Sequence, residues 1–244
     1  IHYSHDAWSV YPPEEAIGIL REAGLHKAFV SSSGVGGALK LHALAPELVV
    51  PVLRPYRSRG ELGTWMHDET VIPYLEERLA SGPYRGIGEF HAYGDDADTP
   101  IMQEVIRLAR ENRLFLHAHS DSDAIERILA ADPGAVVLWA HSGFAAVSEI
   151  RSMLSRYENL RADLAFRSEH ASRGSLEPEW RALFEEFPDR FMVGTDTFSP
   201  ERWYYVREHA AWTRSWLEDL PDDLAQNIAW RNAESLVEAA RTRQ

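Results

Sequence analysis

Short apolar runs of strand length alternate with stretches of helical periodicity along the whole chain. Eight segments have the length and composition of strands: residues 1–4, 27–33, 48–56, 84–91, 114–120, 135–143, 160–166 and 190–196. Helical spacing appears at 12–24, 68–82, 99–113, 122–132, 148–157 and 177–187, and two or more further helices fill 200–241. Strict alternation of strands and helices is typical of a parallel sheet. Eight such units in 244 residues predict an α/β fold, a (β/α)8 TIM barrel, as a single domain over residues 1–244.

An open, doubly wound sheet is the alternative interpretation of this alternation. Such folds carry a glycine-rich phosphate loop after the first strand, with the spacing G-x-G-x-x-G. The segment SSSGVGGALK (31–40) is rich in glycine but lacks that spacing, so we expect a plain loop there. No linker, repeat or low-complexity stretch divides the chain, which favours one domain.

Composition excludes several classes of protein. The formal net charge is −13 and no basic stripe is present, so nucleic acid is not an expected partner. No apolar run approaches the roughly 18 residues of a membrane span, which predicts a soluble protein without a membrane partner. The chain has no cysteine, so any metal site must use histidine, aspartate and glutamate. The oligomeric state stays open, a homo-oligomer included.

The chain opens with IHYSHDAW, which lacks a methionine and places almost nothing before the first apolar stretch. We therefore expect a truncated N-terminus, from which a targeting segment could also be missing. No signal peptide is visible in the residues present. The choice between a bacterial-type cytoplasm and periplasm depends on the missing part.

Polar side chains gather at the carboxyl ends of the predicted strands, where TIM-barrel active sites are built. These residues are His2, Arg54, Glu89, His91, His117, His119, His141, Arg167 and Asp196. Each alone has an ordinary structural interpretation, such as a salt-bridged Glu89 or an Asp196 that caps a turn. Together they are costly to bury unless they are paired or hold a metal. Imidazole and carboxylate without thiolate form the expected ligand set of catalytic zinc or a similar divalent ion.

Four strand ends carry motifs of a known superfamily. GIGEFH (86–91), LFLHAHSD (114–121), VVLWAHSGF (136–144) and RFMVGTDTF (190–198) resemble strands 4, 5, 6 and 8 of the amidohydrolase superfamily, whose members are metal-dependent (β/α)8 hydrolases. The similarity is greatest to the branch that includes aminocarboxymuconate-semialdehyde decarboxylase. The glutamate of GIGEF is also similar to that of TatD-like nucleases. The resemblance covers nearly the whole chain.

The resemblance implies a metal site made of His2, Glu89, His117, His141 and Asp196. The first strand of the superfamily ends in His-x-His; His2 matches the second histidine, and the first is absent from this chain. Glu89 matches a bridging carboxylate, and His117 matches the strand-5 ligand. Asp196 and His141 are the implied catalytic residues, because the superfamily uses them to handle the proton of the metal-activated water or to act as a base.

Four further residues are candidates for substrate binding: Arg54, His91, His119 and Arg167. His117 and His119 are two positions apart on a strand, so their imidazoles point the same way and His119 lies one pleat further out. One strand that supplies two ligands is an open alternative. Guanidinium groups pair well with carboxylate or phosphate, so Arg54 and Arg167 favour a small anionic substrate.

These observations predict a hydrolase that uses one or two divalent ions, zinc first and manganese second, to activate water. The bond cleaved would be an amide, an ester or lactone, or a phosphoester. Non-oxidative decarboxylation on the same scaffold is one alternative, and a barrel that binds a ligand without turnover is another. Two ions bridged by Glu89 would indicate hydrolysis, whereas one ion with His141 free as a base would suit decarboxylation.

Overall fold

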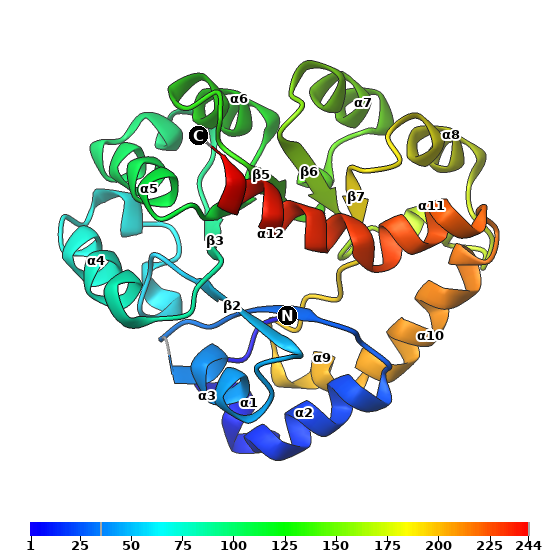
Figure 1. Cartoon of the computed structure of the whole chain (residues 1–244), viewed down its shortest axis with the longest axis horizontal. Coiled ribbons are helices and arrows are strands. Elements are labelled where there is room, and N and C mark those ends of the chain that lie inside the picture. Colours follow the sequence, from blue (N-terminus) through cyan, green and yellow to red (C-terminus); the bar gives the residue numbers. More distant parts are fainter. Residues whose placement is uncertain (35, 244) are drawn as a thin grey trace.

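The computed structural model describes residues 1–34 and 36–243 (Figure 1). Seven parallel strands lie in sequence order in one curled sheet. They are β1 (Ala28–Ser31), β2 (Val49–Leu53), β3 (Gly86–His91), β4 (Phe115–His119), β5 (Val137–Trp139), β6 (Leu160–Asp163) and β7 (Phe191–Met192). Each strand lies inside a predicted one, so the prediction of an α/β TIM-barrel fold is confirmed.

Helices form a layer around the sheet, and α12 crosses one end of the barrel (Figure 1). They are α1 (His5–Val10), α2 (Pro13–Glu22), α3 (Gly36–Leu44), α4 (Val71–Ser81), α5 (Pro100–Glu111), α6 (Ser122–Ala131), α7 (Val147–Arg156), α8 (Pro178–Glu186), α9 (Pro200–Tyr204), α10 (Val206–Leu217), α11 (Asp222–Gln226) and α12 (Asn232–Thr242). Proline begins α2, α5, α8 and α9, in the first turn, where a missing N–H leaves no helical bond unmade. Within the described ranges, no helix is both long and apolar enough to cross a membrane.

The first predicted strand is reduced to one parallel bridge between His2 and Ser31. Thr197 joins this segment to the chain that follows β7. Its Oγ1 accepts a hydrogen bond from the His2 N–H at 2.9 Å and donates one to the His2 carbonyl oxygen at 2.7 Å. A side chain therefore replaces the backbone ladder where the first and last segments of the barrel meet.

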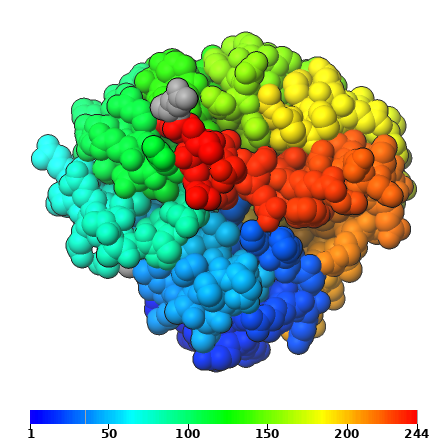
Figure 2. Space-filling view, viewed as in Figure 1, coloured from blue at the N-terminus to red at the C-terminus, as the bar shows by residue number. Residues whose placement is uncertain are grey.

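The C-terminal helix fills the amino end of the barrel. Leu236 and Ala240 of α12 pack in one buried cluster with Val52, Phe115 and Leu138 of the strands. Figures 1 and 2 show α12 crossing the middle of the face turned to the viewer. Apolar side chains therefore fill the amino end of the barrel. The polar groups follow the carboxyl ends of the strands, so they lie at the opposite end.

The glycine-rich segment 31–40 corrects the prediction of a plain loop. α3 begins at Gly36, so residues 36–40 are helical, while Val35 lies outside the described residues. A Cβ on Gly37 would lie 1.7 Å from the Tyr3 carbonyl oxygen and 2.7 Å from Trp8 Nε1. Glycine at position 37 therefore lets α3 approach the first segment of the barrel.

We expect Gly37→Ala to lower the free energy of unfolding by about 3 kcal/mol or more, because the new methyl group meets backbone that has little room to move. Urea unfolding followed by circular dichroism measures the change. Gly18→Ala in α2 is the matched control, since no atom lies within 4 Å of its Cβ position. That variant should gain about 0.5–1 kcal/mol, and equal losses in both variants would contradict the close approach at Gly37.

His170 lies in a buried aromatic cluster of the outer layer. Its ring centroid is 4.6 Å from that of Trp216 and 5.9 Å from that of Trp180. Burial lowers the pKa of His170 to about 4, although a hydrogen bond to the Arg167 carbonyl oxygen opposes the shift. An unfolded histidine titrates near pH 6.5, so the unfolded state binds more protons between about pH 6.5 and 4. The stability that neutral His170 contributes is therefore present above pH 6.5 and is lost as the pH falls through this window.

We expect the free energy of unfolding to fall by up to roughly 3 kcal/mol as the pH is lowered from 7 to 4, because of the lowered pKa of His170. His170→Phe keeps an aromatic ring and cannot titrate, so its stability should depend less on pH, whatever its stability at neutral pH. Urea unfolding of both proteins at several pH values measures the difference. If the stabilities of the parent and of His170→Phe changed with pH in parallel, a lowered pKa of His170 would be contradicted.

Candidate metal site

A cavity of about 330 Å³ opens at the carboxyl end of the strands. Its lining includes the predicted residues His2, Arg54, Glu89, His91, His119, His141 and Asp196, together with Arg59, Phe144, Phe166 and Phe198. The side chains come from the first segment, from β3 and β4, and from the loops after β2, β5, β6 and β7. The structure therefore brings together all the predicted site residues except His117 and Arg167.

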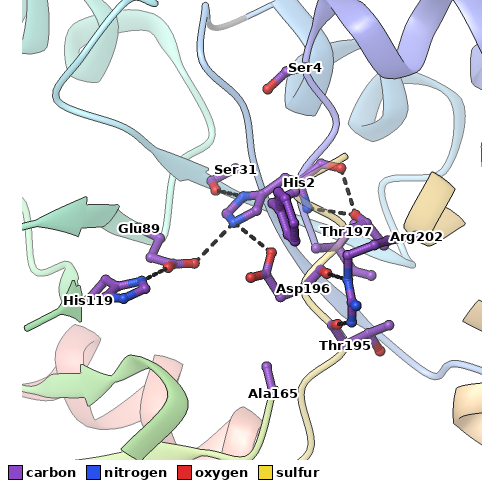
Figure 3. A network of polar contacts seen from close by, with 12 residues as sticks. His2, Ser4, Ser31, Glu89, His119, Ala165, Thr195, Asp196, Thr197 and Arg202 are labelled. Atoms are coloured by element: carbon purple, nitrogen blue, oxygen red, sulfur yellow. Dashed lines mark hydrogen bonds and ion pairs between the residues drawn. The ribbon is translucent and has the colours of Figure 1, made fainter. Parts of the chain in front are cut away.

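The His2 imidazole lies at the centre of this group of side chains (Figure 3). Its Nε2 lies 3.1 Å from Glu89 Oε2 and 3.1 Å from Asp196 Oδ1. Arg54 Nη2 lies 3.1 Å from the same nitrogen, and Ser31 Oγ lies 2.8 Å from His2 Nδ1. A ring nitrogen holds at most one proton, and the arginine keeps all of its own. No single protonation state of His2 therefore satisfies both carboxylates and the guanidinium.

Glu89 is held by three histidines. Its Oε1 lies 2.9 Å from His119 Nδ1 and 3.4 Å from His141 Nε2, and its Oε2 faces His2. Burial raises the pKa of the Glu89 carboxyl, but the hydrogen bonds from these histidines outweigh burial and hold the pKa well below its ordinary value. Glu89 is therefore an ionised carboxylate in the interior of the barrel.

A β-bulge directs Glu89 into the cavity. The register of β3 against β4 pairs Gly88 with His117 and Phe90 with Ala118, so Glu89 has no partner on β4. An extra residue in one strand re-aims its side chain, and bulges are frequent beside active sites. Gly88 permits the close pairing, since a Cβ there would lie 2.2 Å from the His117 carbonyl oxygen.

Asp196 follows β7 in the left-handed region of backbone conformation, with φ +49°. Burial raises the pKa of its carboxyl, but the charge and hydrogen bond of His2 outweigh burial and hold the pKa at about 2. Its Oδ1 is buried, and the His2 Nε2 at 3.1 Å is its one contact with a possible donor among the described residues. The same nitrogen faces Glu89 Oε2, so one imidazole serves two ionised oxygens.

His141 lies on a tight turn after β5 in which four consecutive residues have positive φ: His141, Ser142, Gly143 and Phe144. Its Nδ1 donates to the Ala165 carbonyl oxygen at 3.1 Å, so Nε2 faces Glu89 and, at 3.8 Å, Asp196 Oδ2. Burial lowers the pKa of His141, but the surrounding carboxylates outweigh burial and raise it to about 9.

Arg167, predicted to bind substrate, holds this turn instead of facing the cavity. Its Nη1 donates to the carbonyl oxygens of His141 at 3.0 Å and Ser142 at 3.3 Å, and its Nη2 donates to that of Ala145 at 2.8 Å. Its Nε pairs with Glu169. The guanidinium is thus occupied by backbone and by one surface carboxylate.

His117 lies one pleat deeper than His119 and outside the cavity lining. Its Nε2 is 3.3 Å from Asp163 Oδ2. Asp163 also accepts backbone hydrogen bonds from His141 at 3.1 Å and Ala165 at 2.9 Å. The sequence analysis missed Asp163, although a charged residue inside the apolar segment 160–166 is the signal that could have revealed it.

His91 and Arg54 complete the polar wall of the cavity. The His91 ring stacks on His119 with 4.0 Å between centroids, and burial lowers the pKa of His91 to about 3. Arg54 is 6% exposed; its Nη1 donates to Ser33 Oγ at 3.0 Å, and its Nε has no partner among the described residues. A buried guanidinium with a free donor is suited to an anionic group beside the histidines.

The donor set fits a divalent cation. The ligand atoms of His2, Glu89 and Asp196 all lie within 4.8 Å of one another, and so do those of Glu89, His91 and His119. A cation would satisfy both carboxylates and the His2 nitrogen that they share, which no proton arrangement does. Histidine and carboxylate groups that converge at the carboxyl end of a parallel barrel are typical of metal-dependent TIM-barrel enzymes.

Comparison with known proteins agrees with this class. A family model described as Amidohydrolase matches residues 6–238. The chain therefore belongs to the amidohydrolase family, as the sequence motifs predicted, and is a metal-dependent enzyme of that superfamily. Among curated proteins, no sequence matches the chain.

Solved structures with low sequence identity share the fold. An uncharacterized TIM-barrel protein from Bordetella bronchiseptica is 18% identical, with a TM-score of 0.63 over 93% of this chain and 83% of that one. A 2,6-dihydroxybenzoate decarboxylase in complex with 2,6-dihydroxybenzoate is 12% identical, with a TM-score of 0.59 over 91% and 86%. An amidohydrolase from Burkholderia multivorans with bound zinc is 15% identical, with a TM-score of 0.57 over 95% and 91%.

Proposed function

We propose that residues 1–244 form one catalytic domain, a hydrolase that cleaves an amide, an ester or lactone, or a phosphoester bond of a small anionic substrate. The observation that carries the proposal is the convergence of two ionised, buried carboxylates on one imidazole nitrogen, at 3.1 Å each. A divalent cation among the three groups would offset the repulsion between the carboxylates and the cost of burying them.

The proposed ligands are His2, Glu89, His141 and Asp196, with one histidine from β4. His119 is the better candidate for that ligand, because its Nδ1 contacts Glu89, whereas His117 contacts Asp163. Zinc is the first choice and manganese the second, since imidazole suits the former and carboxylate suits both. Ser31 Oγ lies 2.8 Å from His2 Nδ1 and would accept a hydrogen bond from Nδ1–H, which leaves Nε2 free to bind the ion.

When bound, such an ion supplies a water whose pKa falls from about 15.7 to about 7. Asp196 is ionised, and its Oδ1 shares the His2 nitrogen with Glu89, so it would accept the proton of the attacking water and return it to the leaving group. His141 Nε2 lies 3.4 Å from Glu89 and 3.8 Å from Asp196, so the imidazole could exchange a proton with either carboxylate. General acid–base help of this kind contributes roughly 10²–10⁴-fold to a rate.

The remaining walls of the cavity indicate the kind of substrate. Arg54 presents a buried guanidinium with a free donor, and Arg59 lines the same cavity. Phe144, Phe166 and Phe198 line it as well and are 56%, 36% and 50% exposed. A carboxylate or phosphate on a flat or apolar body fits both features.

Non-oxidative decarboxylation is the second candidate. His141 Nε2 lies 3.4 Å from Glu89 and 3.8 Å from Asp196, both longer than the 3.1 Å contacts of His2. An imidazole outside the ligand set would be free to act as an acid or a base on the substrate.

Metal content per chain, measured on protein purified without chelator, tests the proposal. Glu89→Gln is the variant, and Glu47→Gln, an exposed carboxylate paired with Arg21, is the control. We expect close to two equivalents in the parent and in the control, a clear drop in the Glu89 variant, and hydrolysis of a panel of lactones, esters, amides and phosphoesters. One equivalent that is insensitive to Glu89 would favour decarboxylation. No metal, even after zinc or manganese is added, would contradict both candidates.

A further inference from the structure

Asp196 adopts a backbone conformation that is uncommon for residues with a Cβ. With φ +49° it lies in the left-handed region, which aspartate tolerates better than most residues but which is still less favourable than ordinary helix or strand conformation. The β7 ladder ends at Met192, so strand hydrogen bonds do not hold residues 193–196. The conformation that directs the carboxylate at His2 must be held by side chains.

Arg202 on α9 provides that support. Its Nε donates to the Asp196 carbonyl oxygen at 2.6 Å, and its Nη2 donates to the Thr195 carbonyl oxygen at 2.9 Å. Figure 3 shows the guanidinium reaching both carbonyls from the side of Asp196 opposite Glu89. A planar fork with fixed donor directions grips two adjacent carbonyls, whereas a lysine ammonium is a single point charge.

The flat face of the same guanidinium supports the apolar wall of the cavity. Arg202 Cζ lies 4.0 Å from the ring centroid of Phe166 and 5.8 Å from that of Phe198. Phe166 also has a positive φ, +59°, which is rare for a bulky residue. The cation–π contact with Arg202 stabilises the ring in this position and offsets part of that strain.

We propose that Arg202 is a positioning residue that holds Asp196 in its ligand geometry and fixes Phe166 at the mouth of the cavity. The inference rests on the proposed function, since it takes Asp196 as a metal ligand. Arg202 does not line the cavity, so it acts on bound metal and substrate only through these two residues.

Cobalt(II) bound to the purified protein is the probe, because its visible absorption reports ligand geometry without requiring a substrate. The variants are Arg202→Gln and Arg202→Lys. Arg190→Gln is the matched control: Arg190 Nη1 donates to the carbonyl oxygens of Tyr157 at 3.1 Å and Leu160 at 3.3 Å, at the amino end of the barrel. Cobalt affinity is measured by competition with a chromophoric chelator, and folding is checked by urea unfolding.

We expect the cobalt dissociation constant of Arg202→Gln to rise at least tenfold and its absorption bands to change. Arg202→Lys should lie between this variant and the parent, and Arg190→Gln should bind like the parent even where its stability falls. Equal affinity and equal spectra in Arg202→Gln and Arg190→Gln would overturn the inference while leaving the metal site intact. A parent protein that binds no cobalt would overturn the proposed function and the inference together. If Arg202→Gln does not fold, the lysine variant carries the same comparison.

Discussion

Asp196→Asn is expected to lower kcat by roughly 10²–10⁴-fold at saturating metal. The change removes the ionised oxygen that accepts the proton but keeps the shape of the side chain. Asparagine is among the residues that best tolerate positive φ, so the backbone at +49° should persist. The measurement is steady-state kinetics on the best substrate of the hydrolase panel, with metal content determined on the same samples.

Stability is the control for this variant. The unfolding free energy of metal-free Asp196→Asn should stay within about 1 kcal/mol of the parent, because asparagine retains an oxygen facing His2. A loss of turnover together with intact folding and restored metal would identify Asp196 as the proton acceptor. Turnover within tenfold of the parent would show that Asp196 is not the required proton acceptor.

Thr197→Val should produce a large loss of stability although Thr197 is not a proposed ligand. The Thr197 hydroxyl is buried, accepts from the His2 N–H and donates to the His2 carbonyl. Valine has the same shape and no hydroxyl, so it leaves the buried N–H without a partner, while Trp203 Nε1 still donates to the carbonyl at 3.1 Å. An unsatisfied buried donor costs about 1–3 kcal/mol, and together with the lost second bond we expect about 2–4 kcal/mol.

Thr197→Ser is the matched control, since it keeps the hydroxyl and removes only a methyl group. It should lose about 1 kcal/mol, and urea unfolding measures both variants. Because His2 is a proposed ligand, zinc affinity should fall in the valine variant and change little in the serine variant. Equal stability of the two variants would show that the hydroxyl does not close the barrel.

Much of the candidate site followed from the sequence. Histidines and carboxylates placed directly after apolar runs were expected to meet, and His2, Glu89, His141 and Asp196 do line one cavity. The reason is simple: the carboxyl ends of parallel strands in a closed barrel face the same region.

Other features could not be read from spacing. His117 and His119 lie on the same face of β4, and the period of two does not say which pleat reaches the cavity. The bulge at Glu89 depends on how β3 pairs with its neighbour. Arg167 follows a strand end as Arg54 does. However, its guanidinium donates to backbone carbonyl oxygens of the turn at residues 141–145, so it does not face the cavity.

The sequence by itself determined the order of strands and helices, the parallel sheet, and the family, because hydrophobic period and local motifs are short-range properties. The tertiary structure decided which imidazole faces the carboxylates, how Thr197 closes the barrel, and that Arg202 holds Asp196. These depend on contacts between residues far apart in the chain, such as His2 with Thr197, and on the curl of the sheet that sets their distances. Local periodicity predicts which face of a strand a side chain lies on, but not which residues of other elements it contacts.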